Sequence, residues 1–343
     1  MKKVSIKDIA KMAGVVPSTV SLVLNGRAKE MRISTALAQK IQNIAKQAGY
    51  TPNQVAVSLR TGSSKLIGLM VEDISNIFYA TLARLMEEEF RANGYRIVYC
   101  STKNDPVNGS ELINMLYQRQ VDGYIITPVE GMEKDLQSLK DQHKPVVLID
   151  RFFPDVNVSH VLVDDKKGIA DGMNHLLDKG YKNIGFITVD LGQVQMNYRE
   201  QHYNIFINEH QDKLQSHHML KLSYKLSITQ MVEKISEFIK NTKDLDALFF
   251  ATNYLCLAGL QSLQQLNLSM PDDIAVICFD DHDIFQLYPP GITAIRQPIE
   301  NIAQSAVELL MHQIEFPKND LGAEQIVIPA SIVERGSTGR INN

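Results

Sequence analysis

The segment Val15–Asn25, VVPSTVSLVLN, decides the fold of the N-terminal part of the chain. Pro17 suits the first turn of a helix, because its ring holds φ near the helical value and its missing N–H has no helical partner at that position. Asn25 and the glycine after it are typical of a helix end. The segment therefore predicts a short helix. Its surface carries Ser, Thr and Leu side chains and few groups able to form strong hydrogen bonds.

The residues on either side predict two more helices. Ser5 stands three residues before Asp8, a capping-box spacing that starts a helix over residues 6–13, and a glycine ends it. Ser34 is an N-cap candidate for a third helix, which ends at Gly49. Two helices joined by a short glycine-containing turn predict a helix-turn-helix unit.

The charge of the chain is divided unevenly. Lys and Arg outnumber acids by ten to two up to Gly62, whereas the remainder has 25 basic and 37 acidic residues. A basic N-terminal part on an acidic body is typical of a nucleic-acid-binding module attached to another domain. On charge alone, a solvated basic face without a partner is an equal alternative.

Beyond this part the pattern changes to alternating strands and helices. A short helix is expected over residues 53–60, followed by the linker TGSS at 61–64. Amphipathic segments at 77–93, 108–119, 166–179, 231–240 and 299–314 separate apolar runs, which predicts an α/β body of two doubly wound parallel sheets. The apolar runs are LIGLMV (66–71), YRIVYC (95–100), GYIITP (123–128), PVVLID (145–150), NIGFIT (183–188), ALFFA (247–251) and IAVICF (274–279).

Composition and motifs exclude several classes of protein. With 343 residues, 44% hydrophobic and 22% charged, the chain has the composition of a soluble protein of two or three domains. Three cysteines far apart in apolar surroundings indicate buried free thiols and a reducing cytoplasm. No signal peptide, membrane span, phosphate-binding loop, nucleophile elbow or metal-spaced motif is recognisable, and adjacent His217 and His218 are expected at the surface. No cofactor is expected.

The quoted residues carry a resemblance to a known family. The stretches VSIKDIAKMAGVVPSTVSLVLNG and GYTPNQVAVSLRTGSSKLIGLMVEDISNIFY, with VDGYIITP, VVLIDR, ATN, FDDHD and TAIRQP, strongly resemble the LacI/GalR family of bacterial transcription regulators. The likeness covers essentially the whole chain. It implies a helix-turn-helix head, a hinge helix and two Rossmann-like lobes of the periplasmic-binding-protein type, with a sugar effector between the lobes and a homodimer bound to a pseudo-palindromic operator.

The resemblance assigns DNA contacts in the head. The second helix enters the major groove in this family, and its early residues touch base edges. The implied base contacts are Pro17, Ser18 and Leu22, and the implied backbone contacts are Lys7, Thr19, Ser21 and Asn25. The alternative is that Thr19 and Ser21 are ordinary surface residues of a helix.

The hinge is expected to contribute to sequence specificity. Asn53, Ala56 and Leu59 are its implied DNA contacts, with Leu59 inserted into the minor groove at the operator centre. The alternative for Leu59 is a packing contact with the body. Val57 stands where relatives often have Arg or Gln, and its side chain cannot make their polar contact.

The resemblance also implies an effector site at the carboxyl ends of predicted strands, where open α/β sheets bind ligands. Carboxylate, amide and guanidinium groups suit sugar hydroxyls, and an aromatic ring suits the apolar face of a sugar. Singly, each residue could equally be a helix cap or loop residue. The implied set is Asn76, Phe78, Tyr79, Asp150, Arg151, Arg199, Asn253, Asp280 and Gln297.

Several residues depart from the family pattern. Val16 replaces the usual capping serine, which should cost the second helix about 1 kcal/mol. Leu22 replaces a common arginine; it cannot hydrogen-bond a base, but it can pack on a thymine methyl. His202 replaces a common glycine and Tyr254 a common aspartate, which leaves the shape of the pocket open.

The sequence therefore predicts a cytoplasmic, dimeric, sugar-responsive transcription regulator, more specifically a repressor. Its expected domains are a head (1–50), a hinge (51–62) and a body (63–343). The first lobe is expected over about 63–162 and 293–322, the second over about 163–292 and 323–343. Two alternatives remain: a regulator of the same fold controlled by a partner protein, or a sugar-modifying enzyme on a two-lobed fold.

Overall fold

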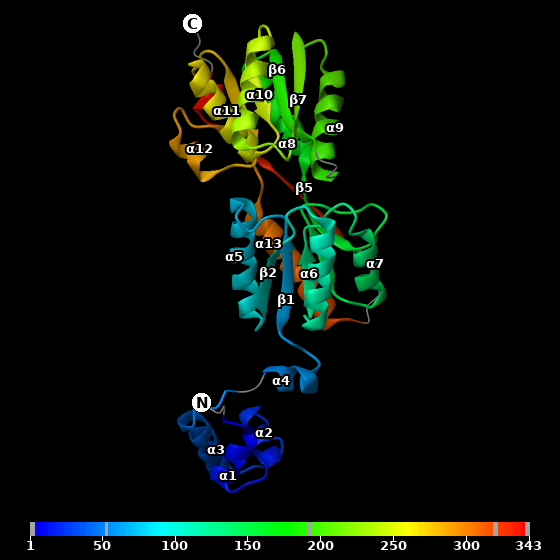
Figure 1. The fold of residues 1–343 in the computed structure, drawn as a ribbon, viewed down its shortest axis with the longest axis vertical. Helices are drawn as coiled ribbons and strands as arrows, with labels where there is room; N and C mark the ends of the chain where they lie inside the picture. Colours follow the sequence, from blue (N-terminus) through cyan, green and yellow to red (C-terminus); the bar gives the residue numbers. More distant parts are fainter. Residues whose placement is uncertain (1–3, 52–53, 191–193, 318–321, 340–343) are drawn as a thin grey trace. The chain divides into compact units, whose positions relative to one another are not determined.

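The chain forms two compact units, divided between Ser64 and Lys65 (Figure 1). The computed structural model describes residues 4–51, 54–190, 194–317 and 322–339. Each unit has a hydrophobic core of its own. The division falls two residues after the expected start of the body. None of the helices in these residues is long and apolar enough to cross a membrane.

The N-terminal unit is a bundle of short helices. They are α1 (Ile6–Ala13), α2 (Pro17–Leu24), α3 (Thr35–Gln47) and α4 (Gln54–Thr61). Apolar residues spaced three and four apart on the first three helices pack into one core, which explains why such short helices are stable together. The fully buried members of this core are Ile9, Ala10, Ala13, Val20, Val23, Ile41 and Ala45.

The N-caps of these helices differ. Ser5 and Asp8 form the expected capping box, in which the Ser5 hydroxyl accepts from the Asp8 N–H and the Asp8 carboxylate accepts from the Ser5 N–H at 2.9 Å. The Ser34 hydroxyl accepts from the Leu37 N–H. Val16 provides no cap to α2, as the sequence predicts. Helix α2 therefore begins with backbone N–H groups that make no hydrogen bond to the side chain of its N-cap residue.

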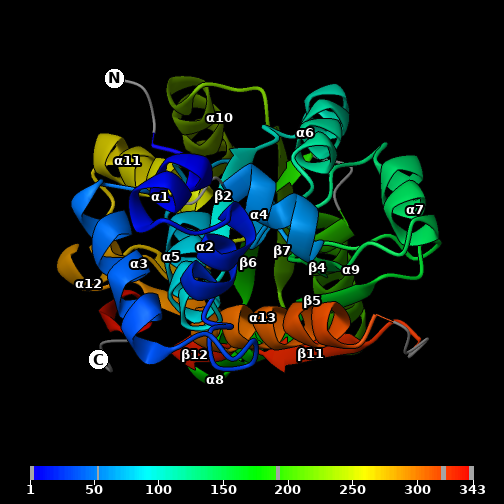
Figure 2. The same ribbon diagram turned by 90° about the horizontal axis from the view of Figure 1, so that it is seen from below.

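The body begins with a six-stranded sheet in the order β11-β5-β4-β3-β1-β2, in which every neighbouring pair is parallel. Helices α5 (Ile77–Ala92) and α13 (Ile299–Glu315) cover one face, and α6 (Pro106–Gln118) and α7 (Glu133–Asp141) cover the other. Figure 2 shows α13 beside β5 and β11. This first lobe contains strands β1 (Leu66–Val71), β2 (Arg96–Ser101), β3 (Gly123–Ile126), β4 (Val146–Ile149), β5 (Ser159–Asp164) and β11 (Gln325–Pro329).

The second lobe repeats this plan. Its sheet has the order β12-β10-β9-β8-β6-β7 and is parallel except for the antiparallel strand β12. Its strands are β6 (Asn183–Asp190), β7 (Ser216–Ser223), β8 (Ala247–Phe250), β9 (Ala275–Phe279), β10 (Thr293–Arg296) and β12 (Ser331–Val333). Helices α8 (Asp165–Asp178) and α9 (Val194–Glu209) pack on one face, and α10 (Ile228–Asn241) and α11 (Asn253–Leu266) on the other.

Two short elements complete the second lobe, namely α12 (Asp283–Leu287) and a 3₁₀ turn at Gly336–Thr338. The three cysteines are free and buried, as expected: Cys100 in the first lobe, and Cys256 and Cys278 in the second.

The chain passes between the lobes three times: after β5, between β10 and α13, and between β11 and β12. The first crossing lies within two residues of the expected boundary. The second crossing lies later in the chain than the boundary expected at residue 292, and the third lies later than the boundary expected at residue 322. The reason is strand pairing, because Thr293–Arg296 is hydrogen-bonded to β9 in the second sheet and Gln325–Pro329 to β5 in the first.

Replacing Val16 by Ser should stabilise α2 by about 1 kcal/mol, because the hydroxyl supplies the missing N-cap acceptor. The backbone already suits a cap, with φ −77° and ψ 150°, and Val16 is 60% exposed. Hydrogen exchange of the α2 amides, measured by NMR, should slow by about fivefold. Val16→Ala is the matched control and should leave exchange unchanged. Equal rates in the two variants would contradict the capping argument.

Candidate functional site

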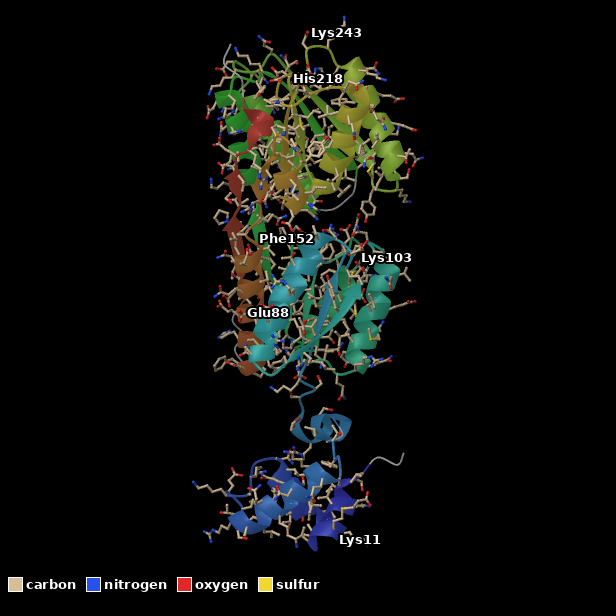
Figure 3. The ribbon with its side chains drawn as sticks, turned by 90° about the vertical axis from the view of Figure 1, so that its left-hand side faces the viewer. Lys11, Glu88, Lys103, Phe152, His218 and Lys243 are labelled. Carbon is tan, nitrogen blue, oxygen red and sulfur yellow. The ribbon has the colours of Figure 1, made fainter. Side chains whose placement is uncertain are left out.

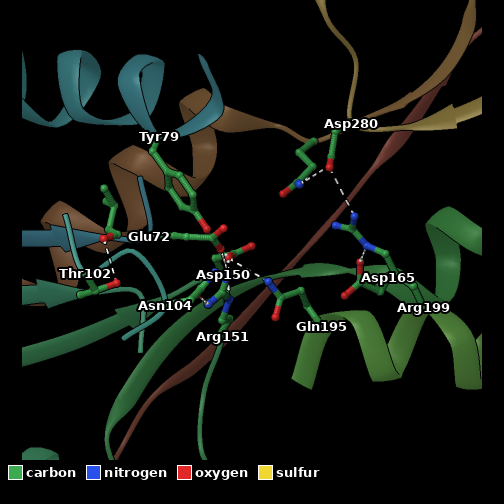
Figure 4. Close-up of polar contacts among 12 residues, drawn as sticks. Glu72, Tyr79, Thr102, Asn104, Asp150, Arg151, Asp165, Gln195, Arg199 and Asp280 are labelled. Atoms are coloured by element: carbon green, nitrogen blue, oxygen red, sulfur yellow. Dashed lines mark hydrogen bonds and ion pairs between the residues drawn. The ribbon is translucent and has the colours of Figure 1, made fainter. Parts of the chain in front are cut away.

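Asp150 and Asp280 occupy equivalent places in the two lobes, each directly after a buried strand. Both have positive φ, 66° and 74°, a conformation that Asp tolerates better than most residues. Their N–H groups donate to carbonyls of the next strand, at Val161 (3.3 Å) and Ile295 (2.9 Å). The turns leave both carboxylates at the carboxyl edges of their sheets, the place where α/β folds bind ligands (Figure 4).

A cavity of about 60 Å³ lies between these two edges. All nine effector residues expected from the sequence line it: Asn76, Phe78, Tyr79, Asp150, Arg151, Arg199, Asn253, Asp280 and Gln297. The other lining residues are Glu72, Gln195, Met196, Tyr224, Thr252 and Tyr254. The structure therefore brings the whole predicted set to one place, from segments more than 200 residues apart in the sequence.

Arg199, on α9, is the most deeply buried charge of the cavity, with its side chain 2% exposed. Its Nε donates to Asp165 (2.8 Å), and its Nη1 donates to the Ala251 carbonyl (2.7 Å) and to Asp280 (3.3 Å). The guanidinium also stacks over the Phe279 ring at 3.7 Å. Burial raises the pKa of Asp165 to about 6, against the opposing effect of Arg199.

Arg151, in the turn after β4 of the first lobe, is also buried, with its side chain 4% exposed. Its Nη2 is paired with Glu72, its Nη1 donates to Asn104 at 2.7 Å, and its Nε lies 3.4 Å from Asp150. The Tyr79 hydroxyl donates to Asp150 at 2.8 Å. Burial raises the pKa of Asp150, although Arg151 and Tyr79 both favour its ionised form.

Hydrogen bonds from the second lobe to the first cross the cavity. The Tyr224 hydroxyl donates to Glu72 at 2.9 Å, and the Gln195 amide donates to Asp150 at 3.2 Å. Both donors belong to the second lobe and both acceptors to the first. The cavity is smaller than the roughly 300–1,000 Å³ of most ligand pockets, so a sugar requires these bridging side chains to move.

Sequence reasoning missed Glu72, Gln195, Met196 and Thr252. Glu72 directly follows the first apolar run, so its place at the carboxyl end of a strand was a usable signal. Gln195 and Met196 begin a helix whose sequence has no amphipathic pattern, and nothing in it pointed to a site. Tyr224 also lines the cavity, and its hydroxyl donates to Glu72.

His202, named as a departure from the family pattern, does not line this cavity. It lines a neighbouring pocket with Phe152, His160 and Tyr198, where Phe152 stacks on His160 at 4.6 Å. Figure 3 shows Phe152 at the junction of the two lobes. Tyr254, by contrast, contributes to the cavity wall. Of the two histidines expected at the surface, His217 is exposed and His218 is half-buried on the edge strand β7.

The expected DNA contacts of the head lie at its surface. Lys7, Pro17, Ser18 and Asn25 are exposed, whereas Thr19, Ser21 and Leu22 are half-buried. Asn53 and the side chains of Ala56 and Leu59 lie outside the described residues. The Asn25 amide donates to the Ser21 carbonyl (2.5 Å) and accepts from Arg60 (3.0 Å), so intramolecular bonds engage much of its polar capacity.

Two family models match the chain. The model of the lacI family of bacterial regulatory proteins matches residues 5–53, and the model of a periplasmic-binding-protein-like domain matches residues 173–338. The first match covers the helix-turn-helix. The second covers most of the second lobe and its connections to the first.

Similar proteins extend these matches to the full length. The HTH-type transcriptional regulator KdgR of Bacillus subtilis is 30% identical, over 97% of both chains, and the ribose operon repressor of Halalkalibacterium halodurans is 28% identical, also over 97% of both. Both are transcription regulators, not enzymes. The crystal structure of the lac repressor dimer bound to operator and the anti-inducer ONPF has the same fold, with a TM-score of 0.85 at 20% identity over 98% of this chain and 99% of that one.

Replacing Asp165 by Asn should change how stability depends on pH. The folded-state pKa of about 6 exceeds the ordinary value of 3.8, so the folded protein holds a proton that the unfolded chain has released. Relative to D165N, the wild-type free energy of unfolding should therefore fall as the pH rises from about 4 to about 6, and stay level above about 7.

Urea unfolding followed by circular dichroism measures this difference at each pH. The Asn side chain can still accept from Arg199, so the comparison isolates the ionisation. A wild-type stability that rises with pH relative to D165N would contradict the raised pKa.

Proposed function

Because this chain belongs to the LacI family of bacterial regulatory proteins, we propose that it represses transcription by binding operator DNA, under the control of a sugar held between its lobes. The chain is a DNA-binding transcription regulator of this family. Its role as a repressor and the class of its effector are the proposal. The observation that carries it is a cavity between the two lobes in which all nine residues expected to bind an effector meet.

The head is suited to the DNA-binding part of this function. Its α2 presents an exposed N-terminal turn at Pro17 and Ser18, the end of a recognition helix that contacts bases. A homodimer would place two such helices on half-sites about one helical turn apart, which requires a pseudo-palindromic operator. The lac repressor, which shares this fold, has been crystallised as a dimer on its operator. Leu59, in the hinge, is proposed to enter the minor groove between the half-sites.

The cavity is suited to a polyhydroxylated ligand. Asp150 and Asp280 offer carboxylate oxygens, while Asn253 and Gln297 offer planar amides that can both donate and accept. The rings of Phe78 and Tyr79 meet edge to face with 5.1 Å between their centroids, and so provide an apolar wall. One full-length relative is a ribose operon repressor, which favours a sugar as the effector here.

Control of DNA binding would follow from lobe closure. The bonds from Tyr224 to Glu72 and from Gln195 to Asp150 hold the lobes together in the present arrangement. A sugar that replaces these donors with its own hydroxyls would stabilise one arrangement of the lobes over another. The resulting change in operator affinity is limited by the difference between the sugar's affinities for the two arrangements.

The first test separates the two units. A truncated protein of residues 65–343 should bind the same sugar as the full chain and show no operator affinity, because the basic head is absent. Calorimetry measures sugar binding and fluorescence anisotropy measures DNA binding. In the full chain the same sugar should change operator affinity. Binding of sugar without any such change would contradict sugar control, and binding of no sugar would favour control by a partner protein.

The second test concerns Leu22, which we expect to contact a base edge by apolar packing, most simply a thymine methyl. Replacing that thymine by uracil removes only the methyl group and should weaken wild-type binding modestly. Leu22→Ala should be nearly indifferent to this change. Leu22→Arg should move the preference towards guanine, with about 1–3 kcal/mol of discrimination.

Operator selection from a random library by the three proteins measures these preferences. The salt dependence of binding should barely change in Leu22→Ala, because no phosphate contact is lost. Selection of one identical half-site by all three proteins would show that Leu22 recognises no base. Specificity would then be assigned to Ser18 and the hinge.

A further inference from the structure

We propose that Glu72 restricts the effector of this protein to uncharged polyhydroxy compounds and excludes sugar acids and sugar phosphates. The inference rests on the proposed effector function of the cavity and adds to it the chemical class of the ligand. It concerns a residue that the family resemblance did not assign to the site.

Both carboxylate oxygens of Glu72 are engaged inside the cavity (Figure 4). One oxygen pairs with Nη2 of Arg151, and the other accepts the Tyr224 hydroxyl at 2.9 Å. The Glu72 side chain is 14% exposed. Its position follows from the backbone, because Glu72 is the first residue after β1 and so lies at the carboxyl edge of the first sheet.

Glu72 is paired with the Arg151 guanidinium, the group of the cavity that would otherwise be available to an anionic ligand. A guanidinium is the protein group best suited to carboxylates and phosphates, since it can donate two parallel hydrogen bonds. Here Arg151 already donates to Glu72 and to Asn104, and its Nε lies near Asp150. An anionic ligand could reach Arg151 only by displacing Glu72, which would leave a buried carboxylate unpaired.

The other guanidinium of the cavity, that of Arg199, is also engaged by carboxylates and so does not offer an anionic ligand an alternative partner. Arg199 lies between two carboxylates, Asp165 and Asp280, and also donates to a backbone carbonyl. Among the described residues, the two guanidiniums of this cluster face four carboxylates, those of Glu72, Asp150, Asp165 and Asp280. An anionic ligand would add charge of the sign already in excess, in a site that water screens weakly.

The same excess of carboxylates favours the binding of neutral hydroxyl groups. Each can donate to a carboxylate without adding charge, and a hydrogen bond to an ionised acceptor is stronger than one between neutral groups. A polyol can also replace Tyr224 as the donor to Glu72 without breaking the pair with Arg151. The arrangement of Glu72 therefore favours a neutral sugar and penalises its oxidised or phosphorylated form.

The test uses the full chain and matched pairs of ligands: D-glucose with D-gluconate and D-glucose 6-phosphate, D-galactose with D-galactonate, and D-ribose with D-ribose 5-phosphate. Calorimetry gives the ratio of the affinities for the neutral and anionic member of each pair. The wild type should bind at least one neutral sugar, and should bind its anionic partners at least tenfold more weakly. In Glu72→Gln, which has nearly the same shape and frees Arg151, that ratio should fall by at least tenfold.

Two further variants separate charge selection from a structural role of Glu72. Asp73→Asn removes the same charge one residue away, where the carboxylate bonds Ser75 and does not line the cavity; the ratio should stay within twofold. Tyr224→Phe removes the bond that links Glu72 to the second lobe. It should change the affinities for both members of a pair by the same factor and so leave their ratio unchanged, because the pair of Glu72 with Arg151 remains. Circular dichroism verifies that every variant is folded.

An unchanged ratio in Glu72→Gln would overturn the inference while leaving the proposed effector function intact. Tighter binding of an anionic member by the wild type would do the same. Failure of the wild type to bind any neutral or anionic sugar would overturn the proposed function, and this inference with it.

Discussion

The structure of the body depends on pairing two guanidiniums that are buried where its lobes meet. Taking such a charge out of water costs several kcal/mol unless carboxylates and hydrogen bonds compensate it. Arg151 and Arg199 obtain this compensation from residues at strand ends or at the start of a helix, including Glu72 after β1, Asp280 after β9 and Asp165 at the beginning of α8. The carboxyl edges of both sheets must therefore converge on the arginines, and this convergence creates a polar cavity in a fold whose cores are otherwise apolar.

The interactions within each lobe are much more extensive than the contacts across the cavity between the lobes. Within each lobe, strands and two helical layers form an extensive core, whereas across the cavity Tyr224 and Gln195 of the second lobe each donate one hydrogen bond to the first. A hydrogen bond contributes about 1 kcal/mol net, or about twice that when its partner is charged. A ligand that supplies several donors could therefore compete with these bridging side chains. On the proposed function, this difference in strength makes the lobe arrangement, rather than the folding of either lobe, the property that an effector would control.

Local sequence signals predicted most of the fold and much of the site. The capping box at Ser5 and Asp8 and all seven apolar runs produced the expected elements, because a cap or a continuous buried strand is determined by neighbouring residues. Strand β7 escaped prediction since it is an edge strand with half-exposed and polar residues. The lobe boundaries were displaced because the pairing of the short strands β10 and β11 depends on distant partners. The family resemblance, not local pattern, supplied the nine cavity residues; the significance of Glu72 required the geometry of Arg151 and Tyr224.

The head imposes a different constraint on function, because its recognition helix offers few free hydrogen-bonding groups. Asn25 is engaged with Ser21 and Arg60, and Leu22 has no polar atom in its side chain. Among the base contacts implied for α2, only Ser18 can hydrogen-bond a base edge through its side chain. On the proposed contacts, discrimination between operators would depend more on apolar packing against thymine methyls and on how easily the central step deforms, where the hinge is proposed to bind. If the hinge supplies the discrimination that α2 lacks, as proposed, an effector acting through the hinge would change which sequences are bound, as well as how tightly.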